Sequence, residues 1–340
     1  MPFHITIQSS GHTFTAAEGE TVLNAALNAG YNLPYGCRNG SCGSCKGEVV
    51  SGTVEYGDTP ISALTVVDVA AGKALFCCAQ ATSDLIIACR ELENTAIPPR
   101  ILPCRVEKKI QLAHDVVALF LRLPANERLQ FMAGQYLEFL LKDGSRRAYS
   151  LANSPSHDNL LELHARLIPG GKFTEYVTHE MPEKAILRIE GPLGSFYLRE
   201  KSDKPIIFVA GGTGFAPIKG MIEHAFDAGS KRQMTLYWGA LAKRDLYMPE
   251  LPEKWAIEHD NFDFIPVLSD PMPQDDWTGR TGLVHQAVLA DKIDLRSVQV
   301  YCCGAPAMVE AIHRDFTANG LPEDEFFSDA FTFAAKMAAI

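Results

Sequence analysis

The chain has 340 residues, of which 47% are hydrophobic, and its formal net charge is −10 at pH 7. At roughly 100–200 residues per domain, this length predicts two or three globular domains. The acidic balance argues against nucleic acid or an anionic membrane surface as a partner. Residues 1–20 alternate like a strand and lack the apolar core of a signal peptide, and no run approaches the ~18 apolar residues of a membrane span. We therefore expect a cytoplasmic, multidomain protein.

A cysteine-rich loop, YGCRNGSCGSCKG, occupies residues 35–47. Cys37, Cys42 and Cys45 stand in it as C-x4-C-x2-C, and Cys77 follows in LFCCAQATSDL. Four thiolates are what a [2Fe–2S] cluster needs, two per iron, and this spacing is the plant-type ferredoxin pattern. The odd total of nine cysteines, in a chain without an export signal, also favours metal or redox use over disulfides.

Alternatives to this cluster remain open. Zinc sites usually use paired C-x2–4-C motifs, and this chain has only one such pair, so zinc is disfavoured. Purely structural cysteines do not usually gather among glycines in a loop. The fourth ligand is open because Cys77 and Cys78 are adjacent; we favour Cys77, with Cys78 packing as a small hydrophobic residue.

Residues 1–93 resemble a plant-type ferredoxin domain through CRNGSCGSC and the later LFCCAQATSDL. The resemblance implies an α+β β-grasp fold, in which a helix, expected at residues 20–30, crosses a small twisted sheet. A cluster of this type carries one electron, with a potential near about −400 mV, so it is a relay that another group must load. The proline-containing stretch 94–103 is expected to be an extended linker.

Residues 104–200 contain short alternating runs separated by turns, which predicts a small antiparallel β-barrel or sandwich. In SRRAYSLAN, Arg147 can pair with a diphosphate, Tyr149 can lie flat on an aromatic ring system, and Ser150 can hydrogen-bond a ring nitrogen. RAYS matches the R-x-Y-S motif of flavoproteins that resemble ferredoxin–NADP reductase. The motif is weak alone, but between a ferredoxin-like domain and a nucleotide-binding segment it indicates FAD.

A second glycine-containing turn follows the RAYS strand, in RLIPGGKFTEYV. Backbone amides at a helix N-terminus receive phosphate, so this turn is the expected clamp for the FAD pyrophosphate, with the helix expected to begin near Thr174. Its candidate residues are Gly170, Gly171, Lys172 and Thr174.

Residues 201–340 are expected to form an α/β domain with a Rossmann-like parallel sheet that binds NAD(P)H. In FVAGGTGFAPIKGM a glycine turn follows an apolar strand and precedes a helix, which is the context of a dinucleotide site. Its candidate residues are Gly211, Gly212, Thr213 and Gly214. The alternative is a sharp strand–helix turn without a ligand.

A later strand, in VYCCGAPAMVE, ends at Cys303 and Gly304, and ligands bind at the carboxyl ends of such strands. In the ferredoxin–NADP reductase family the C-G-x-P-x-M segment lies beside the nicotinamide, so the resemblance implies roles there for Cys303, Gly304 and Met308. Ser150 and Cys303 are accordingly the expected catalytic residues. Related reductases place an aromatic residue near the C-terminus over the flavin, which makes Phe331 a candidate, although an ordinary packed aromatic is equally open.

The order of these domains is similar to that in reductase components of multicomponent oxygenases and in the CDP-6-deoxy-glucoseen reductase group. The resemblance implies an NAD(P)H-dependent oxidoreductase that passes electrons from NADH to FAD, to the cluster, and then singly to a partner oxygenase, a deoxysugar dehydratase or another metalloenzyme. The alternatives are direct reduction of a small molecule by the flavin part, and a non-enzymatic redox sensor. We expect a monomer that prefers NADH, although Lys243 and Arg244 could serve the 2′-phosphate of NADPH.

Overall fold

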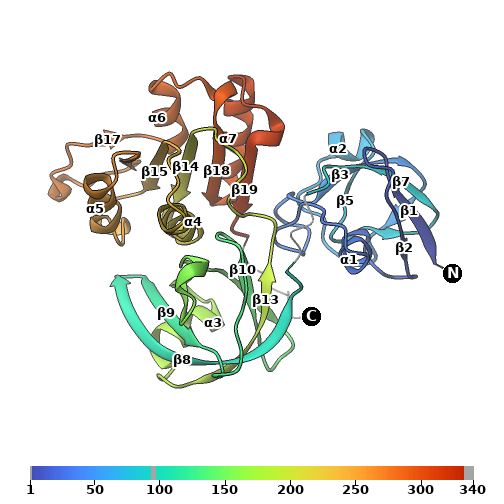
Figure 1. Cartoon of the computed structure of the whole chain (residues 1–340), viewed down its shortest axis with the longest axis horizontal. Helices are drawn as coiled ribbons and strands as arrows, with labels where there is room; N and C mark the ends of the chain where they lie inside the picture. The colour runs from blue at the N-terminus through green and yellow to red at the C-terminus, as the bar shows by residue number, and fades with distance from the viewer. Residues whose placement is uncertain (1, 93–96, 333–340) are drawn as a thin grey trace. The chain divides into compact units, whose positions relative to one another are not determined.

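The structure is a computed structural model that describes residues 2–92 and 97–332, and the chain divides into two compact units (Figure 1). The first unit combines Met1–Pro98 with Gly194–Phe196, and the second combines Pro99–Leu193 with Tyr197–Ile340. Within the described residues, no helix is long and apolar enough to cross a membrane.

The first unit is built on a mixed five-stranded sheet in the order β2-β1-β7-β3-β5, in which only the β1–β7 pair is parallel. Helix α1, Val22–Asn28, confirms the helix expected at residues 20–30; Thr21 caps it by accepting a hydrogen bond from the Asn24 amide. The strands are β1 Phe3–Ile7, β2 Thr13–Ala16, β3 Lys46–Ser51, β5 Lys73–Leu75 and β7 Leu85–Ala88, with β4 Val54–Glu55, β6 Gln80–Ala81 and helix α2 Val66–Ala70 beside them.

The apolar core of this unit follows from the period of two along its strands. Ile5 and Ile7 on β1 are fully buried, and they pack in one cluster with Val22 and Leu23 of α1. The cysteine loop leads directly into β3, so it is anchored to the sheet that builds this core.

The N-terminal half of the second unit is a six-stranded, wholly antiparallel sheet in the order β11-β10-β13-β8-β9-β12. Its edge strands β11 and β12 meet at a bridge between Leu151 and Leu163, so the sheet curls back on itself. The strands are β8 Arg100–Ala113, β9 Val116–Arg122, β10 Tyr136–Leu140, β11 Arg146–Ser150, β12 Leu161–Arg166 and β13 Ile186–Leu193; the short helix α3 is Lys172–Glu175.

Two expected boundaries shift in this half. Strand β8 begins at Arg100, inside the expected linker 94–103, because its pairing with β13 extends back to Arg100. Helix α3 begins at Lys172 rather than near Thr174, because Gly171 already occupies the N-cap.

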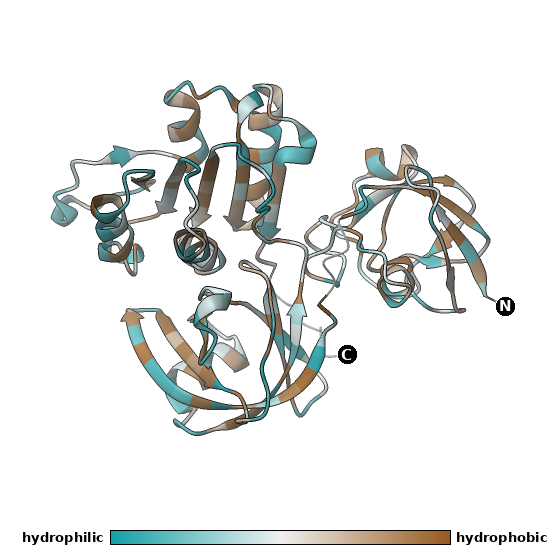
Figure 2. Ribbon diagram, viewed as in Figure 1, coloured by the Kyte–Doolittle hydropathy of each residue, from teal (hydrophilic) through white to brown (hydrophobic). Residues whose placement is uncertain are grey.

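The C-terminal half of the second unit is a parallel sheet in the order β17-β16-β15-β14-β18-β19, whose central strands are strongly hydrophobic (Figure 2). Strands β14 and β18 are neighbours although far apart in sequence, so the direction of strand succession reverses between them and their carboxyl ends flank a natural binding crevice. The strands are β14 Ile206–Gly211, β15 Met234–Ala240, β16 Phe262–Leu268, β17 Arg280–Thr281, β18 Gln299–Gly304 and β19 Phe326–Ala330, and the helices are α4 Phe215–Asp227, α5 Glu250–Glu258, α6 Val284–Ala290 and α7 Pro306–Ala318.

Candidate functional site

The cysteine loop of the first unit is closed by glycine. Gly40 has a φ of +77°, and a Cβ at this position would lie 2.2 Å from the carbonyl oxygen of Pro60. Inside the loop, the Cys37 amide donates to the Cys42 sulfur at 3.4 Å, and the Cys42 amide donates to the Cys37 sulfur at 3.3 Å. The loop therefore directs backbone N–H groups at the cysteine sulfurs, as iron–sulfur sites do.

The four expected ligands form two pairs. A hydrogen bond with Cys42 lowers the pKa of the Cys37 thiol to about 6. Hydrogen bonds with Cys45 and then Cys78 lower the pKa of the Cys77 thiol to about 3. The same hydrogen bonds raise the pKa of Cys42 and of Cys45, so each pair shares one proton in the absence of metal, and binding of iron by both thiolates would displace that proton.

In the ranges 2–92 and 97–332, no three metal-ligating side chains are arranged around a single ion. The cysteines lie instead as Cys37 with Cys42 and Cys45 with Cys77. Two pairs of thiols fit a two-iron cluster, with two thiolates for each iron, better than one tetrahedral zinc.

The RAYS motif lies on β11, at the edge of the curled sheet. The Tyr149 ring packs edge-on to Phe139, with centroids 5.7 Å apart, and against Phe173 of α3 at 5.9 Å. Ser150 is only 7% exposed, and burial raises the pKa of the Tyr149 phenol. The fold therefore brings together two motifs that are more than twenty residues apart in the sequence, RAYS and the GGKFT turn.

The GGKFT turn is held in shape by Thr174. Its hydroxyl accepts from the Ile168 amide at 3.1 Å and donates to the Gly171 carbonyl oxygen at 2.9 Å. A Cβ at Gly171 would lie 2.7 Å from this hydroxyl, so the turn requires glycine. The Thr174 side chain thus shapes the loop, while the backbone and Lys172 are left to meet a ligand.

The two predicted nicotinamide segments meet at the carboxyl ends of β14 and β18. A Cβ at Gly214 would lie 2.0 Å from the Cys303 carbonyl oxygen, and a Cβ at Gly211 would lie 2.6 Å from the Met308 sulfur. Gly304 also faces Gly211, because a Cβ at Gly304 would lie 3.1 Å from the Gly211 Cα. The Cys303 backbone leaves no room for a side chain at Gly214, and the Gly304 Cβ position faces the Gly211 backbone, so the turn is built for close approach of backbone to backbone.

Two further candidates have informative surroundings. The Phe331 amide donates to the Gly304 carbonyl oxygen at 2.8 Å, which places Phe331 at this same edge. The Cys303 side chain is fully buried, and burial raises the pKa of its thiol. At neutral pH this burial favours the protonated form of the thiol.

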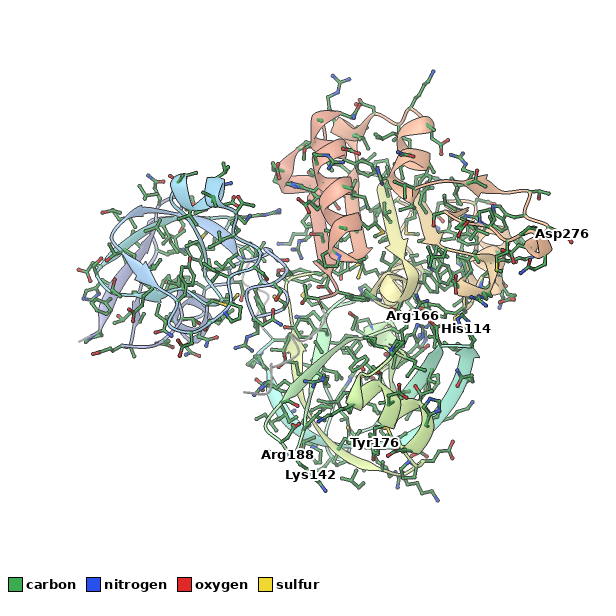
Figure 3. The ribbon with its side chains drawn as sticks, turned by 180° about the vertical axis from the view of Figure 1, so that it is seen from behind. His114, Lys142, Arg166, Tyr176, Arg188 and Asp276 are labelled. Carbon is green, nitrogen blue, oxygen red and sulfur yellow. The ribbon has the colours of Figure 1, made fainter. Side chains whose placement is uncertain are left out.

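Sequence reasoning missed Arg166, at the end of β12 on the edge of the curled sheet (Figure 3). A Cβ at Gly212 would lie 3.0 Å from the Arg166 guanidinium, so the guanidinium borders the glycine turn. Its Nη2 atom is buried without a hydrogen-bond partner, and its Nε, which makes no hydrogen bond either, forms an ion pair with an Asp115 carboxylate oxygen at 3.3 Å. Unused donors beside a phosphate-type turn can bind the diphosphate of a dinucleotide. The one sign of this role in the sequence was a single arginine at the end of a strand.

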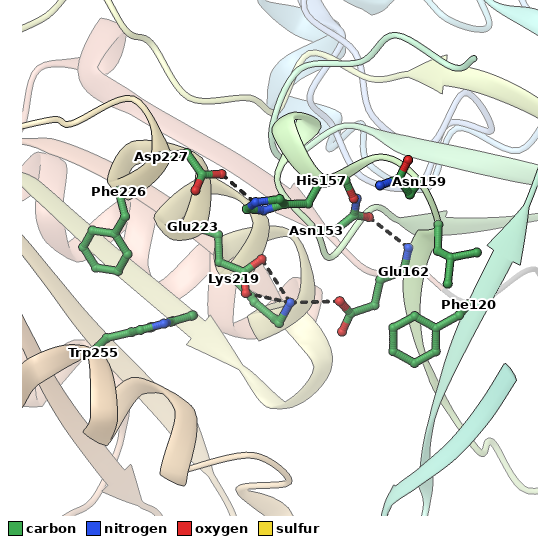
Figure 4. A pocket seen from close by; sticks show the side chains of 11 residues that line it. Phe120, Asn153, His157, Asn159, Glu162, Lys219, Glu223, Phe226, Asp227 and Trp255 are labelled. Carbon is green, nitrogen blue, oxygen red and sulfur yellow. Dashed lines mark hydrogen bonds and ion pairs between the residues drawn. The ribbon is translucent and has the colours of Figure 1, made fainter. Parts of the chain in front are cut away.

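Sequence reasoning also missed a buried ion-pair network centred on Lys219 of α4 (Figure 4). The Lys219 ammonium donates to Glu162 of β12 at 3.0 Å, to Glu223 at 3.1 Å, and to the Ala152 carbonyl oxygen at 3.0 Å. A Cβ at Gly220 would lie 2.9 Å from the carbonyl oxygen of Asn153, so α4 sits directly on the segment that follows RAYS. The network thus holds α4, which follows the expected nicotinamide turn, against β12 and the segment after RAYS, which form the edge of the expected flavin site.

Histidine extends this network. His164 is hydrogen-bonded at 2.8 Å to Glu162 and at 2.8 Å to the Tyr247 hydroxyl, and burial lowers its pKa. A cleft of about 520 Å³ lies beside the network and includes Glu162, Lys219 and Trp255 in its lining, but none of the residues predicted from sequence.

Comparison with known proteins agrees with this arrangement. Three family models match: the 2Fe-2S iron-sulfur cluster binding domain at residues 5–82, the oxidoreductase FAD-binding domain at 103–197, and the oxidoreductase NAD-binding domain at 208–314. A CDP-6-deoxy-L-threo-D-glycero-4-hexulose-3-dehydrase reductase from Yersinia pestis is 40% identical over 97% of this chain and 99% of its own length. The chain belongs to this family of iron–sulfur flavoprotein reductases.

Two further relatives cover the whole reductase. The phenol hydroxylase P5 protein of Acinetobacter pittii is 35% identical over 100% of this chain and 97% of its own. The crystal structure of the Amycolatopsis cytochrome P450 reductase GcoB superposes with a TM-score of 0.81 at 34% identity, covering 98% of this chain and 100% of that one. The reductase is therefore an oxidoreductase that takes electrons from a nicotinamide, passes them through FAD and a [2Fe–2S] cluster, and hands them to a separate acceptor protein.

Proposed function

We propose that this reductase oxidises NADH and delivers single electrons to a metalloenzyme partner. FAD and the cluster, when bound, supply the chemistry that turns a two-electron hydride into single electrons. Two features of the chain carry the proposal. The first unit holds the paired cysteines. In the second unit, Lys219 of α4, the helix after the expected nicotinamide turn, bonds Ala152 and Glu162 at the edge of the expected flavin site.

The residue roles follow from the surroundings described above. Cys37, Cys42, Cys45 and Cys77 hold the cluster. The flavin is held by Arg147, Tyr149, Ser150, Gly170, Gly171, Lys172 and the loop that Thr174 shapes. The nicotinamide dinucleotide lies along Gly211, Gly212, Thr213, Gly214, Gly304 and Met308, with Phe331 beside them.

Arg166 joins this set as a cation for the dinucleotide diphosphate, supported by its free donors beside Gly212. Ser150 remains an expected catalytic residue, because its hydroxyl could hydrogen-bond a ring nitrogen of the flavin. Cys303 remains the second expected catalytic residue, at the carboxyl end of β18 beside the nicotinamide turn, and its thiol is buried there.

The preference for NADH is supported by carboxylates around the two basic residues after β15. Asp275 accepts from the Lys243 amide at 3.2 Å, and its carbonyl oxygen accepts from the Lys243 ammonium at 3.4 Å. Asp245 lies 4.0 Å from Arg244. Both cations are exposed, and the carboxylates beside them would repel a 2′-phosphate. A kcat/KM that favours NADPH over NADH would contradict this assignment.

A deoxysugar dehydrase is the second candidate for the partner, beside a terminal oxygenase. The Yersinia dehydrase reductase is more similar to this chain, at 40% identity, than the phenol hydroxylase protein, at 35%. We further propose a cytoplasmic monomer with domains at 1–93, 104–200 and 201–340, the second of which β8 extends back to Arg100.

The deciding experiment is an anaerobic titration with NADH followed by visible absorption and EPR. Bleaching of both flavin and cluster bands, with a one-electron EPR signal that disappears when an oxygenase or dehydrase component is added, supports the relay. Bleaching of the flavin alone, with undiminished reduction of small acceptors, would favour the small-molecule reductase instead.

A further inference from the structure

The cysteine site contains a fifth thiol. The Cys78 sulfur lies 3.4 Å from the Cys77 sulfur. A Cβ at Gly40 would lie 3.3 Å from the Cys78 sulfur, so this side chain points toward the loop that carries Cys37 and Cys42. Cys78 is buried, as a small hydrophobic residue would be, but its sulfur faces the ligands.

The backbone explains why two consecutive residues can both face the site. The amides of Cys78 and Ala79 donate to the same carbonyl oxygen, that of Leu75, at 2.9 and 2.8 Å. This tight turn presents successive side chains about 100° apart, as a helix does, instead of on opposite faces as a strand does. Replacing one sulfur by the other therefore requires a shift of a few ångströms and no change in strand pairing.

The other three ligand positions lack such a neighbour. The thiols that contact Cys37, Cys42 and Cys45 are themselves assigned ligands. Position 77 is thus the ligand position with a spare thiol beside it, among the residues that the structure describes.

We propose that Cys78 is a standby fourth ligand of the cluster, which binds iron when the Cys77 thiolate is missing. The Cys78 thiol releases its proton to solvent as the iron–sulfur bond forms, and no oxidation or reduction accompanies the exchange. The inference rests on the proposed [2Fe–2S] site and adds that its ligand positions differ in their tolerance of substitution.

The test compares four variants of the full chain, Cys77→Ala, Cys78→Ala, the double variant and Cys45→Ala, after anaerobic reconstitution with iron and sulfide. Alanine is used because it offers no ligand atom. The readouts are iron and acid-labile sulfide per FAD, and the EPR spectrum of the reduced protein. We expect Cys78→Ala to match the wild type, and Cys77→Ala to keep most of its cluster with altered g-values. The double variant and Cys45→Ala should hold roughly tenfold less cluster, because three thiolates bind it poorly.

Each contrary outcome has one meaning. If Cys77→Ala loses as much iron as the double variant, Cys78 is no standby ligand. If Cys78→Ala alone loses the cluster, Cys78 is the resident ligand and the inference is wrong. If the wild type itself binds no iron and sulfide, the proposed function fails, which is a distinct result. FAD content and NADH-dependent ferricyanide reduction, which should be unchanged in all variants, show that the second unit is folded.

Discussion

The cysteine loop of the first unit and the flavin–nicotinamide edge of the second are built in opposite ways. Three of the four proposed cluster ligands lie within nine consecutive residues, whereas the edge combines β11, β12, α4 and β18 from across the second unit. In the loop each ligand is a single covalent contact that no distant residue replaces. At the edge, closely packed backbone segments and buried charges together shape the binding site, so no single residue carries it alone. We therefore expect all-or-none losses at Cys37, Cys42 and Cys45 and graded losses in the second region.

The largest expected effect is in the loop. Cys37→Ser replaces a soft thiolate by a poor iron ligand and should lower cluster content and electron delivery to cytochrome c at least about tenfold. NADH-dependent ferricyanide reduction should persist, because the second unit is separate. Cys89→Ser, a half-buried cysteine outside the four ligands, is the matched control. Equal loss of both activities with FAD still bound would show that the cluster is not downstream of the flavin.

The next effect is at the ion-pair network. Lys219→Met leaves Glu162 and Glu223 buried without their cation and should lower the free energy of unfolding by about 3 kcal/mol. Lys254→Met, whose side chain is 66% exposed in a pair with Glu258, should change it by under about 0.5 kcal/mol. Urea unfolding monitored by flavin fluorescence measures both. Indistinguishable variants would mean that the network carries little stability.

A smaller effect, on the KM for NADH, is expected at Arg166. Arg166→Gln removes the cation beside Gly212 and should raise KM for NADH about tenfold, with a lesser change in kcat. Arg166→Lys should restore part of the loss, and FAD content should not change. Arg188→Gln, at an exposed position on β13, is the control. A drop in FAD content with KM for NADH unaltered would assign Arg166 to the flavin.

The smallest effect concerns the surface of the first unit. Residues 1–93 carry nine acidic and four basic side chains. Association with a basic partner should therefore slow by a few fold between low and physiological ionic strength, as salt screens the attraction. Stopped-flow reduction of cytochrome c over a salt series measures it; a flat response would mean that the charge serves solubility alone.

The sequence by itself determined the cysteine site, the order of the domains and the glycine turns. Ligand spacing is a local property, and Gly40 and Gly214 are required by backbone approaches that leave no room for a Cβ. These signals stay readable because they depend on covalent neighbours and on glycine's unique conformational range.

Only the tertiary structure decided which side chains complete these sites. Arg166 and Lys219 look like ordinary surface charges in the sequence, and become functional candidates because β12 and α4 are packed together. Cys303 reads as reactive, yet neighbouring strands bury its thiol completely. Cys78 reads as a packing residue, yet a turn at Leu75 aims its sulfur at the ligands. Burial and charge pairing arise from contacts between segments distant in the chain, which no local pattern encodes, and the direction of the Cys78 side chain depends on backbone hydrogen bonds that the residue types alone do not show.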